Sequence, residues 1–416
     1  MTSTTQASTT PTVVTTPHPF HRFPYLAAMD PEDEEFRREL REFLADHPAP
    51  AFDRQQNLAD SLRAGLAWHG ELAAHGFPIP ACPAEYGGAD RSVALQLIQA
   101  EEMAAAGANF SVNIVGISML TPLLLALGTP EQRRRWIPPV VQGRELWCQL
   151  FSEPGAGSDL FGLRTTATRD GDVLKLNGQK IWSSTAAEAD RGLMLARTEP
   201  GSRGKQGISC LIVDMGAPGI TVRPIRQMNG GAEFAEVFFD DAPVPVSDVV
   251  GRMHDGAVAA LRVLAAERSG LSMGYYALLA AQFEQLLAAV PPATVARHLD
   301  TVTDLWAALA AQRLGAIRQA SNAGRGANGR APDLKDTASD LAVAAAGKIG
   351  VGTLASRIAH LRLELLGPRL VAHGPEDDFA AQMADRFTGA LALSLGGGTH
   401  QIQRNAIADG LLRMPR

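Results

Sequence analysis

Cysteine is scarce in this chain of 416 residues, which contains only Cys82, Cys148 and Cys210. The three are widely spaced and form no CxxC pair, a pattern that argues against a disulfide framework and against a zinc site. We therefore expect free thiols, no bound metal and a reduced, cytoplasmic setting.

Positive charge and long apolar runs are also in short supply. Lys and Arg number 38 against 44 Asp and Glu, which gives a formal net charge of -6. Nucleic-acid binding needs clustered cations that displace counterions, so we expect no nucleic-acid partner. The apolar run "LTPLLLALG", Leu120 to Gly128, is about half of the roughly 20 residues that a membrane-spanning helix needs, and we expect no membrane span.

Residues 1–29 lack the features of a signal peptide. The stretch "MTSTTQASTTPTVVTTPHPFHRFP" is rich in Thr, Ser and Pro, and it has neither a charged start nor an apolar core segment. Because such a composition cannot bury enough apolar surface to fold, the sequence predicts a disordered tail.

The rest of the chain shows a change of periodicity that divides it into three regions. Residues 30–146 have a helical pattern, in which "DPEDEEFRRELREFL" places Phe36, Leu40 and Leu44 on one face. Residues 147–255 switch to short alternating segments such as "VLKLNG" and "ISCLIV", separated by turn signals, which predict a small antiparallel β-domain. Helical periodicity returns over residues 256–416, so the predicted fold class is α+β, mainly α.

Two segments of the β-region carry polar groups suited to a ligand. In "LFSEPGAGSD", Leu150 to Asp159, two glycines allow a close approach to the backbone beside two serine hydroxyls. The same composition is common in ordinary turns. In "LNGQKIWSSTAAEAD", Leu176 to Asp190, a tryptophan followed by two serines suits an aromatic heterocycle with polar edges, although a strand tryptophan is usually core.

Together with "FAEVFFDDAPVPVSDVVG" (Phe234 to Gly251) and "GGGTHQIQRNAIADGLLRMPR" (Gly396 to Arg416), these segments resemble the acyl-CoA dehydrogenase family. The four motifs occur in the family's order and span nearly the whole chain after the tail. The resemblance implies an N-terminal helical domain, a middle β-barrel and a C-terminal four-helix bundle, with FAD at a subunit interface of a homodimer or homotetramer. It implies cofactor contacts from a set of eight residues: Phe151, Ser152, Ser158, Trp182, Ser183, Ser184, Thr399 and Gln401.

The reaction implied by the resemblance removes an α-proton and a β-hydride from an acyl thioester of CoA or of an acyl carrier protein. The product is a trans-2-enoyl thioester, the flavin N5 accepts the hydride, and an electron-transfer flavoprotein takes the electrons. An α-C–H is a weak acid, so the site needs a positioned carboxylate and hydrogen bonds to the thioester oxygen. Some family members carry this carboxylate directly before "GT", where the present chain has Gly397.

A second arrangement in the family places the glutamate on the first long helix of the C-terminal region, and "LRVLAAERSGLSMGYYALL" matches it at Glu267 and Arg268. A structural ion pair is the alternative for this Glu-Arg pair. The same-face neighbours of Glu267 are all apolar or glycine, so burial is expected to raise its pKa: Val263, Leu264, Gly270, Leu271 and Gly274.

We predict that Glu267 is the catalytic base and that the backbone N–H of Gly397 donates to the thioester oxygen. The resemblance assigns substrate contacts to Ser158, Arg268 and Gly398. His400 and Glu85 are two further acid–base candidates, which we interpret as a cofactor-side and a structural residue.

Two features of the family are missing. The Arg-(Gln/Lys)-x-Phe-Gly motif, whose arginine reaches the FAD phosphates, has no match, with Arg297 the nearest cation, and "LLGPRL" (Leu365 to Leu370) lacks the usual double glycine. Three interpretations follow: a working flavin dehydrogenase, which we favour; a flavin oxygenase of the same fold, which would not need Glu267; and a binding subunit of a heteromer.

Overall fold

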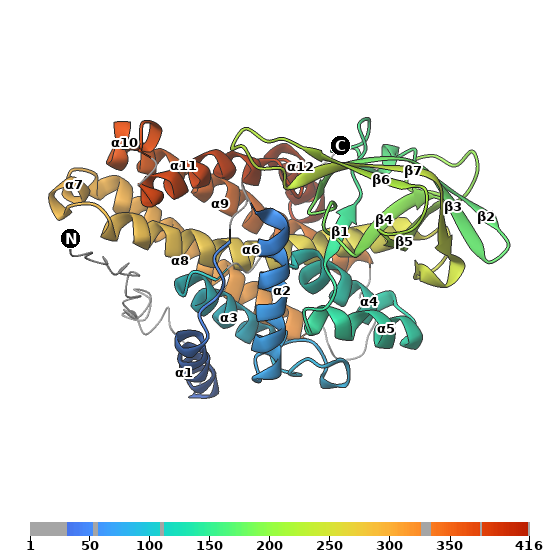
Figure 1. Ribbon diagram of the computed structural model, residues 1–416, viewed down its shortest axis with the longest axis horizontal. Helices are drawn as coiled ribbons and strands as arrows, with labels where there is room; N and C mark the ends of the chain where they lie inside the picture. Colours follow the sequence, from blue (N-terminus) through green and yellow to red (C-terminus); the bar gives the residue numbers. More distant parts are fainter. Residues whose placement is uncertain (1–30, 53–56, 109–111, 326–333, 375–376, 415–416) are drawn as a thin grey trace, which may run out of the picture.

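Helices, then strands, then helices follow one another along the chain, as the periodicity predicts (Figure 1). The computed structural model describes residues 31–52, 57–108, 112–325, 334–374 and 377–414. The predicted tail, residues 1–29, lies outside the described residues. In Figure 1 the N-terminal helices lie below the C-terminal helices, and the sheet occupies one end of the molecule.

The N-terminal region consists of helices that pack on one another and on the bundle. Phe36, Leu40 and Leu44 are buried on the first of them, as their spacing predicts, against Trp68 and Leu72 of the second. A π-helical turn, η3, lies directly before α4. The elements are α1 (Pro31–Asp46), α2 (Leu58–Ala74), η2 (Ala84–Tyr86), α3 (Val93–Ala105), η3 (Gly116–Leu120), α4 (Thr121–Leu127) and α5 (Pro130–Val141).

The middle region is one sheet of eight strands in the order β6-β7-β3-β2-β4-β5-β8, with β1 paired to β4. Side chains of β3 and β7 share a core with side chains of β4 and β5, so the sheet curls around a core of its own, in agreement with the β-domain predicted. The strands are β1 (Trp147–Leu150), β2 (Thr166–Asp170), β3 (Val173–Ser184), β4 (Arg191–Arg197), β5 (Ile208–Asp214), β6 (Ile220–Ile225), β7 (Phe234–Pro245) and β8 (Val249–Val250).

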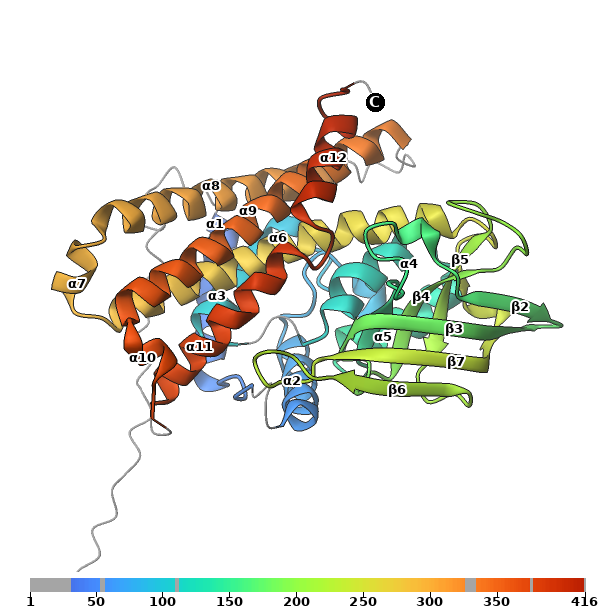
Figure 2. The same cartoon turned by 90° about the horizontal axis from the view of Figure 1, so that it is seen from above.

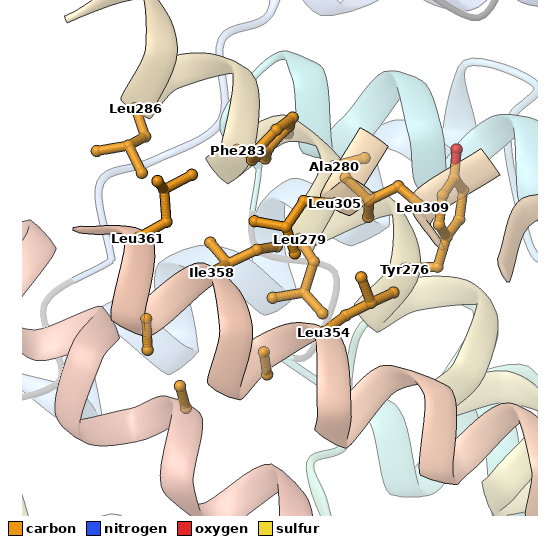
Figure 3. Packing of buried hydrophobic residues seen from close by; sticks show 14 of the residues in the cluster. Tyr276, Leu279, Ala280, Phe283, Leu286, Leu305, Leu309, Leu354, Ile358 and Leu361 are labelled. Carbon is orange, nitrogen blue, oxygen red and sulfur yellow. The ribbon is translucent and has the colours of Figure 1, made fainter. Parts of the chain in front are cut away.

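The C-terminal region is a bundle of long helices with shorter ones at its ends (Figure 2). Its core is built from aliphatic and aromatic side chains of α6, α8 and α9, among them Tyr276, Phe283, Leu309, Leu354 and Ile358 (Figure 3). The helices are α6 (Gly256–Ala288), α7 (Pro292–Ala296), α8 (Leu299–Arg325), α9 (Leu334–Leu366), α10 (Pro368–Val371), α11 (Asp378–Ala390), η6 (Leu391–Ser394) and α12 (His400–Gly410).

Helix α6 joins the three regions, because it contacts α8 and α9 in the bundle, α3 and η3 in the N-terminal region, and β5 in the sheet. With 33 residues it is about 50 Å long. A helix surrounded in this way is apolar on every side. Any ionisable group buried in its first half therefore lies where all three regions meet.

Helix α9 bears on the prediction that the chain has no membrane span. Its segment Leu341–Leu366 has the length and composition of a membrane-crossing helix, and half of its most apolar window is buried inside the protein. Ala355, Ile358 and Leu361 of this segment belong to the core of the bundle. The hydrophobicity of α9 is thus accounted for by its central position among the other helices.

A buried network of ion pairs ties the N-terminal helices to the bundle. Arg37 of α1 binds Glu102 at 2.6 Å and Glu101 at 3.1 Å, both on α3, and Arg313 of α8 binds Glu101 at 2.6 Å. The exposed fractions of these four side chains are 6% or less. Three helices that are far apart in the sequence are therefore held by one cluster of charges.

Candidate active site

Glu267 lies in the first half of α6 and is 4% exposed. Burial raises the pKa of its carboxyl group, while a hydrogen bond from Gln149 and the charges of Arg268 and Lys348 act to lower it. Gln149, on β1, donates through Nε2 to Glu267 Oε2 at 3.4 Å. The burial and the raised pKa that the apolar neighbours predict are thus confirmed, and the result is a desolvated carboxylate of increased basicity.

Two buried cations flank this carboxylate. Arg268 is 6% exposed and Lys348, on α9, is 4% exposed. Burial lowers the pKa of Lys348 to about 8, with the charge of Glu267 acting to raise it. Lys348 Nζ donates to the carbonyl oxygen of Leu393 in η6. Lys348 therefore connects the carboxylate electrostatically to the turn that precedes the glycine-rich loop.

The glycine-rich loop adopts a backbone conformation that favours glycine. Gly397 and Gly398 have φ angles of 68° and 95°, in the left-handed region. Gln403, fully buried on α12, donates through Nε2 to the carbonyl oxygens of Gly397 at 2.8 Å and Gly398 at 3.2 Å. A Cβ placed on Gly398 would lie 3.7 Å from an Nη atom of Arg268. The loop is thus held in place beside the residue that follows Glu267.

The loop after β1 is anchored by a buried ion pair that the sequence analysis did not anticipate. Lys180 Nζ lies 2.8 Å from Glu153 Oε1 and also donates to the carbonyl oxygen of Phe151 at 3.1 Å. Glu153 accepts from the backbone N–H groups of Arg164 at 2.6 Å and Thr165 at 3.0 Å. Burial acts to raise the pKa of Glu153, but these interactions, led by the charge of Lys180, bring it below its usual value.

The two sequence motifs of the β-region are joined by hydrogen bonds. Ile181 donates from its backbone N–H to the carbonyl oxygen of Ser152 at 2.9 Å, directly before Trp182. Trp182 has a φ of 60° and is 58% exposed. Its ring and that of Phe234 meet edge to face, with 6.2 Å between the ring centroids. Ser183 is buried, and its hydroxyl has no hydrogen-bond partner among the described residues. An exposed indole beside an unsatisfied hydroxyl is suited to a planar, polar-edged ring such as a flavin.

The remaining predicted residues differ in exposure. Ser158 and Gln401 are exposed, Ser152 and Ser184 are half-buried, and Phe151 is buried. Thr399 caps α12, because its side chain accepts from the backbone N–H of Ile402 at 3.3 Å. All of these lie in the β1 loop, at the end of β3 or at the start of α12, next to the elements already described.

The other residues weighed from the sequence lie in less suitable surroundings. His400 packs its ring against Gly352 of α9, where a Cβ would be 2.4 Å from Nε2. Burial and the charges of Lys348 and Arg404 lower its pKa. Glu85 is exposed on η2. Arg297 directly follows α7 and bonds back to Ala293 and Thr294 of that helix, at the end of the bundle opposite the sheet (Figure 2).

A cavity of about 310 Å³ lies beside the segment of α6 that contains Glu267, although Glu267 itself is not among the described residues that line it. Ala266, Gly270 and Gly274 of α6 form part of its wall, and Gly270 and Gly274 lie three and seven residues after Glu267, on the same side of the helix. The rest of the wall comes from α2, α3, η3 and the segments around them. Most of its surface is apolar, as a site for the hydrocarbon part of a ligand requires.

Three residues of this site were missed or undervalued at the level of sequence: Lys348, Glu153 and Gln403. A single lysine in the Ala- and Gly-rich stretch "LAVAAAGKIGVG" was the available signal for Lys348. A charge in an otherwise buried helix requires a partner. For Glu153 and Gln403 the pattern offered none, because their partners, Lys180 and backbone N–H groups for Glu153 and backbone carbonyl groups for Gln403, are brought close only by the fold.

Comparison with known proteins identifies the class to which this arrangement belongs. Residues 30–144 match the family model "Acyl-CoA dehydrogenase, N-terminal domain", and residues 148–242 match "Acyl-CoA dehydrogenase, middle domain". The chain is 36% identical over 394 residues to acyl-CoA dehydrogenase IpdE1 of Mycobacterium tuberculosis, covering 92% of this chain and 98% of that protein. It is 37% identical to FadE34 of the same organism over 83% of this chain and 46% of that protein.

Solved structures agree with this match. The ChsE4-ChsE5 complex from Mycobacterium tuberculosis superposes with a TM-score of 0.72 at 29% identity, covering 93% of this chain and 99% of that one. The Tcur3481-Tcur3483 steroid ACAD gives a TM-score of 0.75 at 26% identity, covering 93% of this chain and 99% of that one.

The chain belongs to the acyl-CoA dehydrogenase family. It is an oxidoreductase with the fold predicted from its sequence, and the cofactor of its family is FAD. The exposed indole of Trp182 and the unsatisfied hydroxyl of Ser183 are consistent with that cofactor.

Proposed function

We propose that this chain catalyses the FAD-dependent α,β-dehydrogenation of an acyl thioester, with Glu267 as the base that removes the α-proton. The observation that supports this most strongly is the position of Glu267: a desolvated carboxylate on α6, one position after Ala266 and three before Gly270, both of which line an apolar cavity. A carboxylate of raised pKa is the group that removal of a weakly acidic C–H proton requires.

In this proposal the chain's own groups divide the work of the proton step. Glu267 accepts the α-proton on a carboxylate oxygen while Gln149 fixes the orientation of the other oxygen. The backbone N–H of Gly397 donates to the thioester oxygen, where negative charge develops as the proton leaves. Arg268 and Gly398 contact the substrate beside it, and the left-handed backbone at both glycines sets the direction of the N–H groups.

FAD, when bound, supplies the N5 atom that accepts the β-hydride. We propose that Trp182, Ser183 and Ser184 hold one side of its ring system, and that the β1 loop holds another through Phe151, Ser152 and Ser158. Thr399 and Gln401 lie at the start of α12 and contact the cofactor from the glycine-rich loop. The ion pair of Glu153 and Lys180 orders the β1 loop before any ligand arrives.

The natural substrate and partners belong to the same proposal. We propose a thioester of CoA or of an acyl carrier protein as substrate, an electron-transfer flavoprotein as electron acceptor, and a cytoplasmic location. One of the similar structures is named a steroid ACAD, and a polycyclic acyl group is therefore a substrate class to test.

A second candidate is a subunit of a heteromer whose partner completes the FAD site. Two of the similar structures are complexes of two different chains, ChsE4-ChsE5 and Tcur3481-Tcur3483. The Arg-(Gln/Lys)-x-Phe-Gly motif is also missing here, and Arg297 is bonded to the short helix that precedes it. A homodimer or homotetramer remains the alternative. The oxygenase interpretation is disfavoured because it gives no role to a buried Glu267.

The test compares two glutamate variants of α6 by visible spectroscopy. Glu267→Gln is expected to retain bound FAD and to lose its bleaching by acyl-CoA under anaerobic conditions, by at least about 100-fold in rate. The matched control is Glu284→Gln, because burial also raises the pKa of Glu284, to about 7. Glu284 lies 17 residues further along α6, about 25 Å away. We expect this control to bleach at the wild-type rate.

The outcomes separate the candidates. Unchanged bleaching in Glu267→Gln contradicts the assignment of the base. A yellow wild type that no thioester bleaches supports the oxygenase, and a colourless chain that turns yellow only with a second chain supports the heteromer.

A further inference from the structure

The cavity beside α6 is not lined by hydrocarbon alone. Several polar side chains lie on its wall, and three of them are satisfied by the protein itself. Asn113 donates to the carbonyl oxygen of Glu145 and accepts from the backbone N–H of Trp147. Gln99 donates to the carbonyl oxygen of Phe77, and the hydroxyl of Thr121 donates to the carbonyl oxygen of Gly116. These three groups have their bonds in place without a ligand.

His69 of α2 differs from them. Its side chain lines the cavity, and its Nε2 is shielded from solvent without a hydrogen-bond partner in the part of the chain that the structure describes. An unsatisfied ring nitrogen shielded from water is unfavourable unless another molecule supplies the missing bond. A ligand in the cavity is the molecule that can do so.

Gln96 of α3 and Ser118 of η3 extend this polar part of the wall. Both line the cavity, and within the described ranges neither side chain shows a hydrogen bond to the protein. Ser118 lies against α6, since a Cβ on Gly270 would be 2.8 Å from its hydroxyl oxygen. His69, Gln96 and Ser118 thus come from three elements and contribute donors and acceptors to one apolar space.

The charge state of His69 limits the kind of ligand group that can bind in the cavity. Burial lowers its pKa to about 4, so the imidazole is neutral near pH 7. A neutral imidazole and an amide exchange hydrogen bonds with an uncharged oxygen, whereas a carboxylate would need a cation in the same space. The cavity wall carries no Lys or Arg among its described residues.

We propose that the cavity receives an acyl group bearing an uncharged oxygen, a ketone or a hydroxyl, which hydrogen-bonds to His69 and Gln96. The proposal rests on the proposed function, because it assigns the cavity to the acyl part of the thioester. It narrows the substrate from acyl thioesters in general to oxygenated ones. A plain hydrocarbon of the same shape leaves His69 unsatisfied and is selected against.

The experiment measures binding and reaction separately. The probes are matched CoA thioesters: cyclohexane-1-carbonyl-CoA with its 4-oxo and 4-hydroxy derivatives, and a decalin-carbonyl set of the same design. Dissociation constants are measured by calorimetry on the FAD-loaded Glu267→Gln protein, which is expected to bind without reacting. Anaerobic bleaching of the wild type gives kcat/KM for the same probes.

In at least one of the two probe sets, we expect the oxo or hydroxy thioester to bind at least about tenfold tighter than the hydrocarbon thioester of the same ring. His69→Phe, which keeps the ring and removes the nitrogens, is expected to reduce that preference to about one. His69→Gln is expected to retain part of the preference for oxygenated probes. If His69→Phe does not fold, Gln96→Met provides the test and is expected to reduce the same preference. The matched control is His75→Phe, an exposed histidine that follows α2 outside the cavity wall, and its preference should equal that of the wild type.

Equal binding of oxygenated and hydrocarbon probes overturns this inference, and so does a preference that survives both His69→Phe and Gln96→Met. Failure of every probe to bind overturns it as well. The proposed function fails separately, if probes bind but none bleaches the wild-type flavin.

Discussion

Lys348 gives the carboxylate of Glu267 a compensating charge inside the protein. Desolvation alone would hold Glu267 protonated, and a protonated carboxyl group cannot accept the α-proton. The charges that act on Lys348 come from Glu267 and Arg268 of α6, and Lys348 in turn acts on His400 of α12. Arg404 also faces His400 from α12. In the proposed mechanism, Glu267 acts as a base above its pKa, which burial raises and which the hydrogen bond from Gln149 and the charges of Arg268 and Lys348 lower.

Lys348→Met is therefore expected to move the pH profile of flavin reduction. Removing the cation raises the pKa of Glu267, so the acidic limb of kcat/KM shifts to higher pH. Because the pKa of Lys348 is about 8, the wild type loses the same charge above that pH, and the two profiles should converge there. The measurement is the bleaching rate in single-turnover experiments between about pH 5.5 and 9.5, a range chosen around those values.

Lys348→Arg restores the charge and is expected to restore the position of the limb. A variant that is slower by the same factor at every pH would contradict an electrostatic role for Lys348 and leave it a structural one.

The burial of a residue could be predicted from the sequence where its neighbours on the same helix determine its surroundings. The burial of Glu267 follows from its own helical neighbours, such as Val263 and Gly274, and the structure confirms it. Lys348 could not be paired with Glu267 in the same way, because they meet only through the packing of α9 on α6. Gly397 and Gly398 were identified from a motif, and the backbone angles that require glycine appear only in the structure.

At the scale of elements, the β1 loop is held by a buried ion pair. Glu153 and Lys180 are 7% and 0% exposed, and they hold the loop after β1 against β3. Removing one member of a buried pair leaves the other charge uncompensated, at a cost of about 3–5 kcal/mol. Because the loop carries Phe151 and Ser152, which we propose as FAD contacts, we expect its order and the affinity for FAD to be linked.

Glu153→Gln is expected to lower the amount of FAD that copurifies and to lower the melting temperature of the protein. The ratio of flavin to protein absorbance and a thermal melt with added FAD measure these effects. Glu199→Gln serves as the control, because Glu199 is exposed in the same region. Full FAD occupancy in Glu153→Gln would show that the loop keeps its shape without the pair.

At the scale of the whole molecule, the order of the three regions was predictable, whereas the way they assemble was not. The change of hydrophobic period marks helices and strands locally. Helix α6 has apolar residues on every side, so its sequence does not indicate which side meets the bundle, the sheet or the N-terminal helices. The ion pairs of Arg37, Glu101 and Arg313 form only after these helices have come together.

Arg313→Met is expected to destabilise the assembly of the N-terminal helices with the bundle, by about 3–5 kcal/mol, since it leaves Glu101 with less compensation. A fall in the melting temperature, with earlier protease cleavage of the N-terminal region, is the expected readout. Arg318→Met on the same helix is the control, because Arg318 is exposed and surface changes usually stay within about 0.5 kcal/mol. Equal melting of the two variants would assign no stabilising role to the network.

The π-helical turn at Gly116–Leu120 has a consequence for how this enzyme can diverge. A π-turn holds one residue more than the corresponding turn of α-helix, so loss of one residue converts it to regular helix. Such a deletion rotates everything before it by about 100° relative to α4. Ile114, which precedes the turn and lines the cavity, would then face another direction. If the cavity holds the acyl group, as we propose, we expect insertions and deletions of single residues at this turn, and not only substitutions, to change the set of acyl groups that it accepts.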